Sequence, residues 1–122
     1  MKILIADDDR VIAQLIAAVV RTTGHIPLHA YDAMQTVMFA SRPPAPHMII
    51  LDINMPGGSG LDALMKIKRS AKTCMIPVIV VSGSIDQSLA RKVGELGAEA
   101  FLAKPVDPDA LQQAIEAAAA SL

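Results

Sequence analysis

Hydrophobic residues along the chain form short runs that alternate with segments of helical spacing. Four runs, at residues 2–6, 47–51, 76–81 and 100–103, are rich in Ile, Leu, Val and Ala and show little polar alternation. This pattern is typical of strands that are covered on both faces, as in a parallel sheet. A weaker run at 26–30 contains Pro27, which lacks a backbone N–H and therefore predicts a strand at the sheet edge.

Apolar residues three and four positions apart fill the segments between these runs and predict helices. The stripes lie at 11–20 after Asp9, 34–38 after Asp32, 61–68 after Ser59, 89–96 before Gly97 and 111–122 after Pro108. Asp and Ser favour helix starts, Pro is tolerated at the first helical position, and Gly favours helix ends. In the first stripe we expect Val11 and Leu15 to pack together with Ile16 and Val20.

A strand followed by a helix, five times over, predicts an α/β fold with a parallel sheet, right-handed crossovers and helices on both faces. The chain has 122 residues and no linker long enough to divide it. We therefore expect residues 1–122 to form one domain.

Composition excludes several classes of function. The formal net charge is -1, and no polybasic run favours nucleic acid or an anionic membrane as a direct partner. No apolar run approaches the ~18 residues of a membrane span, so we expect a cytoplasmic protein. A single Cys excludes an intrachain disulfide and a Cys-based zinc site.

Charged and polar residues follow four of the predicted strands. Asp7 and Asp8 end the first, Asp52 the third, Ser82 the fourth and Lys104 the fifth. Ligands of open α/β sheets bind at the carboxyl ends of the strands, where these groups would converge. Three carboxylates within ~5 Å repel one another, so we expect Mg²⁺, which binds carboxylate oxygens and leaves room for phosphate.

A carboxylate beside Mg²⁺ and an ammonium can attack a phosphoryl donor and form an acyl phosphate. Asp52 is the expected nucleophile because it stands alone at a central strand end. Phosphorylation adds about one negative charge, which the Lys104 ammonium and the Ser82 hydroxyl can stabilise.

The motifs that carry these groups resemble those of receiver domains in bacterial two-component response regulators. They are ADDD at 6–9, LDINMP at 51–56, GGSGL at 57–61, VVSG at 80–83, GA at 97–98 and AKP at 103–105. The resemblance covers essentially the whole chain. It implies a flavodoxin-like five-stranded sheet of order 2-1-3-4-5 and a cis peptide bond between Lys104 and Pro105.

The resemblance also implies roles for individual residues. Asp52 would accept phosphate from a histidine kinase or histidine phosphotransfer protein, and Ser82 and Lys104 would contact it. Mg²⁺ would be held by Asp8, Asp52 and the backbone carbonyl of Asn54, with Asp7 acting through water. Phe101 would be the aromatic switch, although it lacks the hydroxyl of a Tyr, and Ser82 stands where Thr is commoner.

Such a domain transmits its signal through a surface that binds another protein. We expect no DNA-binding or catalytic segment after Leu122, and therefore expect a downstream protein target to bind the fourth helix, fifth strand and fifth helix, roughly residues 87–120. The chain would not be an enzyme beyond its own phosphorylation and dephosphorylation. Two alternatives are a receiver-like binding module without phosphorylation and a Mg²⁺-dependent phosphatase of the haloacid-dehalogenase type. The latter needs a second Asp as general acid, where this chain has Asn54.

Overall fold

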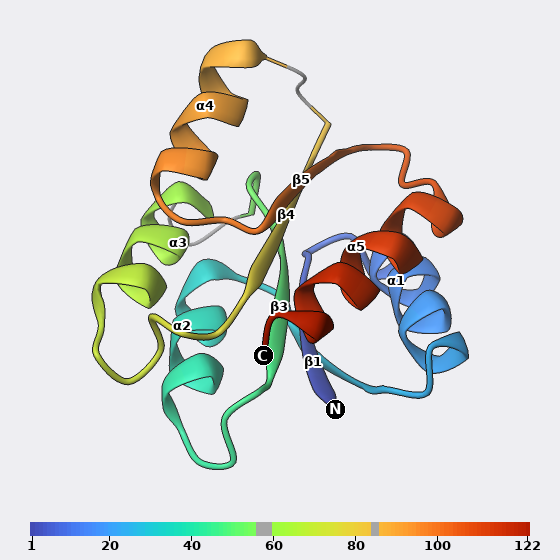
Figure 1. The fold of residues 1–122 in the computed structure, drawn as a ribbon, viewed down its shortest axis with the longest axis horizontal. Helices are drawn as coiled ribbons and strands as arrows, with labels where there is room; N and C mark the ends of the chain where they lie inside the picture. The colour runs from blue at the N-terminus through green and yellow to red at the C-terminus, as the bar shows by residue number, and fades with distance from the viewer. Residues whose placement is uncertain (56–59, 84–85) are drawn as a thin grey trace.

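The computed structural model describes residues 1–55, 60–83 and 86–122, which form strands and helices in strict alternation (Figure 1). Residues 56–59, which belong to the LDINMP and GGSGL motifs and include the expected helix start at Ser59, lie outside the described residues. The elements are β1 (Lys2–Ala6), α1 (Arg10–Thr22), β2 (Ile26–Ala30), α2 (Ala33–Ser41), β3 (Met48–Asp52), α3 (Gly60–Arg69), β4 (Val78–Ser82), α4 (Gln87–Glu95), β5 (Ala100–Ala103) and α5 (Pro108–Ala120).

The five strands form one parallel sheet of order β2-β1-β3-β4-β5. This is the flavodoxin-like order expected from the sequence, with the Pro27 strand at an edge. Every strand runs the same way, so the carboxyl ends of β1, β3, β4 and β5 lie along one rim of the sheet.

The sheet separates two apolar layers. Alternate strand residues point to opposite faces, so Leu4 and Leu51 join the layer beneath α2, α3 and α4, whereas Ile5 and Ile50 join the layer beneath α1 and α5. Figure 1 shows α1 and α5 on one side of the sheet and the other helices on the opposite side. Both faces are covered, which explains why the central strands are apolar throughout.

Helix ends coincide with the capping residues of the sequence. The Asp9 side chain accepts hydrogen bonds from the backbone N–H groups of Val11 and Ile12 at the start of α1. Gly24 follows α1 with φ +83° and Gly97 follows α4 with φ +103°. This left-handed region is strained for other residues, so glycine at these positions ends the helices.

The structure corrects the expected packing of α1. Val11 and Leu15 are 72% and 64% exposed instead of packing in the core. The helix has apolar residues on more than one side, and the side that faces the sheet includes small residues that permit close approach. The buried residues are Ala13, Ile16, Ala17 and Val20.

Two expected boundaries are also wrong. β4 begins at Val78 instead of residue 76, because Pro77 lacks an N–H and the Ile76 carbonyl accepts a hydrogen bond from Lys68 Nζ at 2.7 Å. α5 ends at Ala120, so Leu122 lies beyond the last helical turn and is exposed. Among the described helices, none is long and apolar enough to span a membrane.

Candidate functional site

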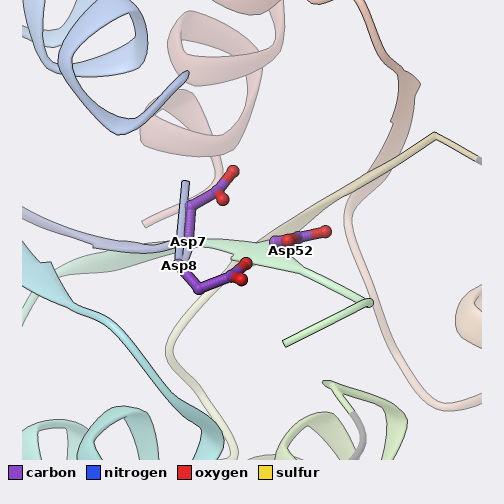
Figure 2. A group of neighbouring side chains, drawn as sticks. All are labelled: Asp7, Asp8 and Asp52. Carbon is purple, nitrogen blue, oxygen red and sulfur yellow. The ribbon is translucent and has the colours of Figure 1, made fainter. Parts of the chain in front are cut away.

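An acidic cluster lies where β1 and β3 end. One carboxylate oxygen from each of Asp7, Asp8 and Asp52 lies within 4.8 Å of the other two. Figure 2 shows Asp7 and Asp8 at the end of β1, next to Asp52 at the end of β3, with the Asp8 carboxylate directed toward Asp52. Asp7 and Asp52 are only 1% and 3% exposed, whereas Asp8 is exposed. The cluster therefore combines two carboxylates removed from water with one at its mouth.

Lys104 lies against the buried pair. Its Nζ atom is 3.1 Å from Asp7 Oδ2 and 3.3 Å from Asp52 Oδ2, and its side chain is 18% exposed. The residue directly follows β5, and its backbone N–H donates to the Ser82 carbonyl at 2.8 Å. The Lys104–Pro105 peptide bond is cis, as the resemblance implied. Asp7, Asp52 and Lys104, which are at least 45 positions apart in the sequence, thus meet at one end of the sheet.

Hydrogen bonds from backbone N–H groups two positions further along the chain orient the two buried carboxylates. Asp7 Oδ1 accepts from the N–H of Asp9 at 2.9 Å, and Asp52 Oδ1 accepts from the N–H of Asn54 at 3.1 Å. Each bond closes a local turn immediately after the strand. In both residues, Oδ1 is held by the backbone while Oδ2 faces the Lys104 ammonium.

The site carries unbalanced negative charge. Burial raises the pKa of Asp7 above its ordinary value, and the nearby Asp52 carboxylate adds to this, while the Asp9 N–H and Lys104 oppose it. Burial also lowers the pKa of Lys104, but the Asp7 and Asp52 carboxylates outweigh it and raise the pKa overall. Lys104 therefore stays charged, yet one ammonium faces a cluster of three carboxylates.

The donor set fits a hard divalent cation. Carboxylate oxygens are the ligands that Mg²⁺ prefers, and the three side chains approach closely enough to share one ion. The Lys104 contact with Asp7 falls short of a well-aligned hydrogen bond, so the buried Oδ2 atom of Asp7 keeps acceptor capacity. A cation near the cluster would reduce the repulsion among its carboxylates.

Ser82 and Phe101 lie on the neighbouring strands β4 and β5. Ser82 is fully buried at the end of β4, one position past the Val81 that pairs with Asp52. Phe101 is half-buried in β5 and pairs with Val80, which shares a sheet face with Ser82. Phe101 packs against the apolar layer beneath α2, α3 and α4. Asn54 follows β3 with an exposed side chain.

An apolar groove beside Lys104 was not predicted from the sequence. It has a volume of about 170 Å³ and lies between α1 and the segment from Lys104 into α5. The only signal in the sequence was the excess of apolar residues on α1, which the expected stripe had assigned to the core. Its lining includes Ile12, Leu15, Val19, Pro105, Val106 and Pro108.

A second missed feature is Gly60, the first residue of α3. Its N–H donates to the Ile53 carbonyl at 2.8 Å, and a Cβ atom there would lie 2.5 Å from the Ile53 Cα and 2.6 Å from the Asp52 carbonyl oxygen. The glycine therefore lets α3 begin directly against the end of β3. The GGSGL segment contained this residue, but sequence alone did not indicate which glycine is in close contact.

Comparison with known proteins agrees with the fold. The model of the response regulator receiver domain family matches residues 3–116. The chain belongs to this family. Among relatives, this receiver domain is 35% identical over 117 residues to the protein PilH of Pseudomonas aeruginosa, covering 95% of each chain.

Other relatives are longer or have known structures. The phosphate regulon transcriptional regulatory protein PhoB of Klebsiella pneumoniae is 32% identical over 116 residues, which cover 95% of this receiver domain but 50% of PhoB. The chain thus spans about half the length of the PhoB proteins that it matches. The crystal structure of the NtrX receiver domain from Brucella abortus is 30% identical with a TM-score of 0.89, covering 98% of this chain and 99% of that one.

Proposed function

We propose that this chain is the phosphoacceptor switch of a two-component relay, in which Asp52 receives a phosphoryl group with Mg²⁺ as cofactor. Receiver domains act as signalling switches and not as classical enzymes. The observation that carries the proposal is the position of Lys104, whose ammonium contacts both Asp7 and Asp52 within an acidic cluster suited to a divalent cation.

In the proposed reaction, Asp52 is the nucleophile. A carboxylate oxygen of Asp52 attacks phosphorus, the bond from phosphorus to the donor imidazole nitrogen breaks, and the imidazole leaves with that electron pair. The product is an acyl phosphate. Lys104, already within 3.3 Å of Asp52 Oδ2, would bind a phosphoryl oxygen, and Asp7 would help to hold its ammonium in place.

Mg²⁺ would be held by Asp8, Asp52 and the Asn54 backbone carbonyl, with Asp7 acting through water. When bound, it supplies positive charge that offsets the charge of the transferring group. Because Asp8 lies at the exposed mouth of the cluster, its carboxylate can bind an ion that arrives from solvent.

The relay to a downstream target would run through Ser82 and Phe101. Phosphorylation adds about one negative charge to the site, and the Ser82 hydroxyl is a neutral donor at the adjacent strand end. Ser82 and Phe101 share one face of the sheet, so a shift of the β4 end would change the packing around the aromatic ring. A downstream protein would read this change at α4, β5 and α5.

The phosphoryl donor would be a histidine kinase or a histidine phosphotransfer protein. The apolar groove beside Lys104 supports a protein donor, because exposed Val11 and Leu15 extend its apolar surface outward along α1. A helical surface packed there would present its histidine near the rim of the sheet. The proposal places the chain in the cytoplasm, where phosphoryl groups derived from ATP are available.

Phosphorylation by a small donor tests the proposal. With acetyl phosphate and Mg²⁺, intact-mass spectrometry should show a phosphoryl adduct on the wild-type chain, which Asp52→Asn abolishes and chelation of Mg²⁺ suppresses. Asp8→Asn should reduce it strongly. Asp9→Asn is the matched control, because it makes the same change one residue away and asparagine still caps α1.

The control variant should be phosphorylated like the wild type. An equal adduct on Asp52→Asn would contradict the assignment of the nucleophile. Absence of any Mg²⁺-dependent adduct would instead favour a receiver fold that acts as a binding module.

A further inference from the structure

Helix α2 has an outward face that is unusually apolar for a surface helix. None of its residues, Ala33–Ser41, carries a charge. Its inner side is buried through Ala33, Thr36 and Ala40, yet Met34 is 68% exposed, and Met38 and Phe39 are exposed as well. Surface helices normally present polar residues to water, and a helix that is apolar on both sides is normally covered on both.

The exposed methionines border a groove between α2 and α3, which pack against each other on the side of the sheet opposite α1 and α5 (Figure 1). The groove has a volume of about 220 Å³. It is lined by Met34, Val37 and Met38 from α2 and by Asp62, Ala63 and Lys66 from α3.

On the α3 side of this groove and the hollow beyond it, basic residues outnumber acidic ones. Lys66 and Arg69 are exposed, and together with Asp62, Met65 and Ser70 they line a second hollow that continues along α3. The other acidic or basic residue in the groove lining is Asp62, which lies one helical turn before Lys66. The surface thus pairs an uncharged apolar helix with a positively charged border.

We propose that this α2–α3 face, defined by Met34, Met38, Phe39, Lys66 and Arg69, docks an amphipathic helix of a partner protein. The apolar side of that helix fills the groove, and acidic residues along one edge pair with Lys66 and Arg69. Methionine side chains adapt their shape to an incoming apolar surface, as in other helix-binding grooves. The face lies across the sheet from the Lys104 groove, so this interaction is separate from the proposed phosphoryl donor.

Other occupants fit less well. A second copy of the chain bound symmetrically would bring the basic border of one face toward that of the other. An anionic membrane would match the basic residues, but a flat bilayer leaves a recessed groove unfilled. A helix with its own acidic edge satisfies both the shape and the charge.

Titration with a designed peptide tests the proposal on the full chain. The probe is a fluorescent helical peptide of about five turns with leucines on one face and glutamates along one edge. Anisotropy should show saturable binding, and NMR amide shifts should change in α2 and α3. Met34→Gln should weaken binding roughly tenfold. Lys66→Glu should weaken it and favour a peptide with lysines in place of the glutamates.

Met75→Gln is the matched control, because it makes the same substitution at a methionine that is 84% exposed and lies outside the lining of both grooves. It should leave binding unchanged. Absence of saturable binding, shifts confined to α1, or equal binding by Met34→Gln would overturn the proposal. So would Met34-dependent binding to phosphatidylglycerol vesicles without peptide binding, or Met34-dependent dimers in analytical ultracentrifugation.

Discussion

His29 shows how one side chain can make stability depend on pH. Its Nδ1 atom is buried without a hydrogen-bond partner among the described residues, and its ring stacks on Tyr31 with centroids 6.0 Å apart. Burial lowers the pKa of His29 below 6.5, and the charge of Arg21 lowers it further. The folded protein therefore takes up this proton less readily than the unfolded chain does.

The sign of the effect follows from that difference. As the pH falls below about 6.5, the unfolded chain binds the proton first, so the free energy of unfolding decreases until the folded-state pKa is reached. Replacing the imidazole by a phenyl ring in His29→Phe keeps an aromatic ring and removes the titration. Urea unfolding at pH 7.5 and 5.5 should show a smaller loss of stability in His29→Phe than in the wild type, and an equal loss would contradict this account.

Individual residues also show where sequence reasoning stops. The strand ends predicted which acids meet, and Asp9 was correctly expected to cap the first helix, but the residue pattern did not show which of Asp7 and Asp8 is buried. In the structure Asp7 is buried, Asp8 lies at the mouth and Asp9 caps α1. The burial of Asp7 and the exposure of Asp8 depend on backbone hydrogen bonds in the turn after β1, which no residue pattern specifies.

At the scale of elements, the start of α3 depends on close contact with the end of β3. A methyl group at Gly60 would collide with the backbone of Ile53 and Asp52, and backbone cannot move aside as a side chain can. Gly60→Ala should therefore destabilise the protein by about 1–3 kcal/mol, as overpacking does elsewhere. It should also displace the Asp52 region and slow phosphorylation.

Gly94 provides the control within another helix. It is exposed in α4, and no atom lies within 4 Å of the position of an added Cβ. Gly94→Ala should stabilise the protein by about 0.5–1 kcal/mol through helix propensity. Thermal unfolding of both variants checks the pair, and a similar shift of the same sign in both would refute the contact argument.

Elements were predicted well where one physical rule dominates. Parallel strands buried on both faces are apolar throughout, and aspartates and glycines mark helix ends, so their order and approximate bounds were confirmed. The inward face of α1 was not predicted correctly, because apolar residues at 11 and 15 compete with those at 13, 16, 17 and 20. Only the packing distance to the sheet decides between them.

At the scale of the whole molecule, folding forces like charges together at one end of the sheet. Lys104→Met would leave Asp7 and Asp52 buried with no ammonium nearby. We expect a loss of about 3 kcal/mol without divalent ions, at the low end for a broken buried pair because Lys104 is partly exposed. Millimolar Mg²⁺ should restore part of the lost stability by binding the folded state.

Thermal melts with and without Mg²⁺ measure both effects. The exposed Lys72→Met variant is the control, and we expect it to change stability by less than about 0.5 kcal/mol. Equal destabilisation by the two variants would indicate that Lys104 does not neutralise the cluster.

The edge position of strand β5 affects how the charge of the cluster can be balanced. It is bonded to β4 alone, and none of its four residues is fully buried, unlike those of β3 and β4. The ammonium that faces the buried carboxylates thus directly follows a border strand, whose displacement disturbs few interior contacts. Lys104 can therefore move when the charge at the rim changes, while the hydrophobic layers stay intact.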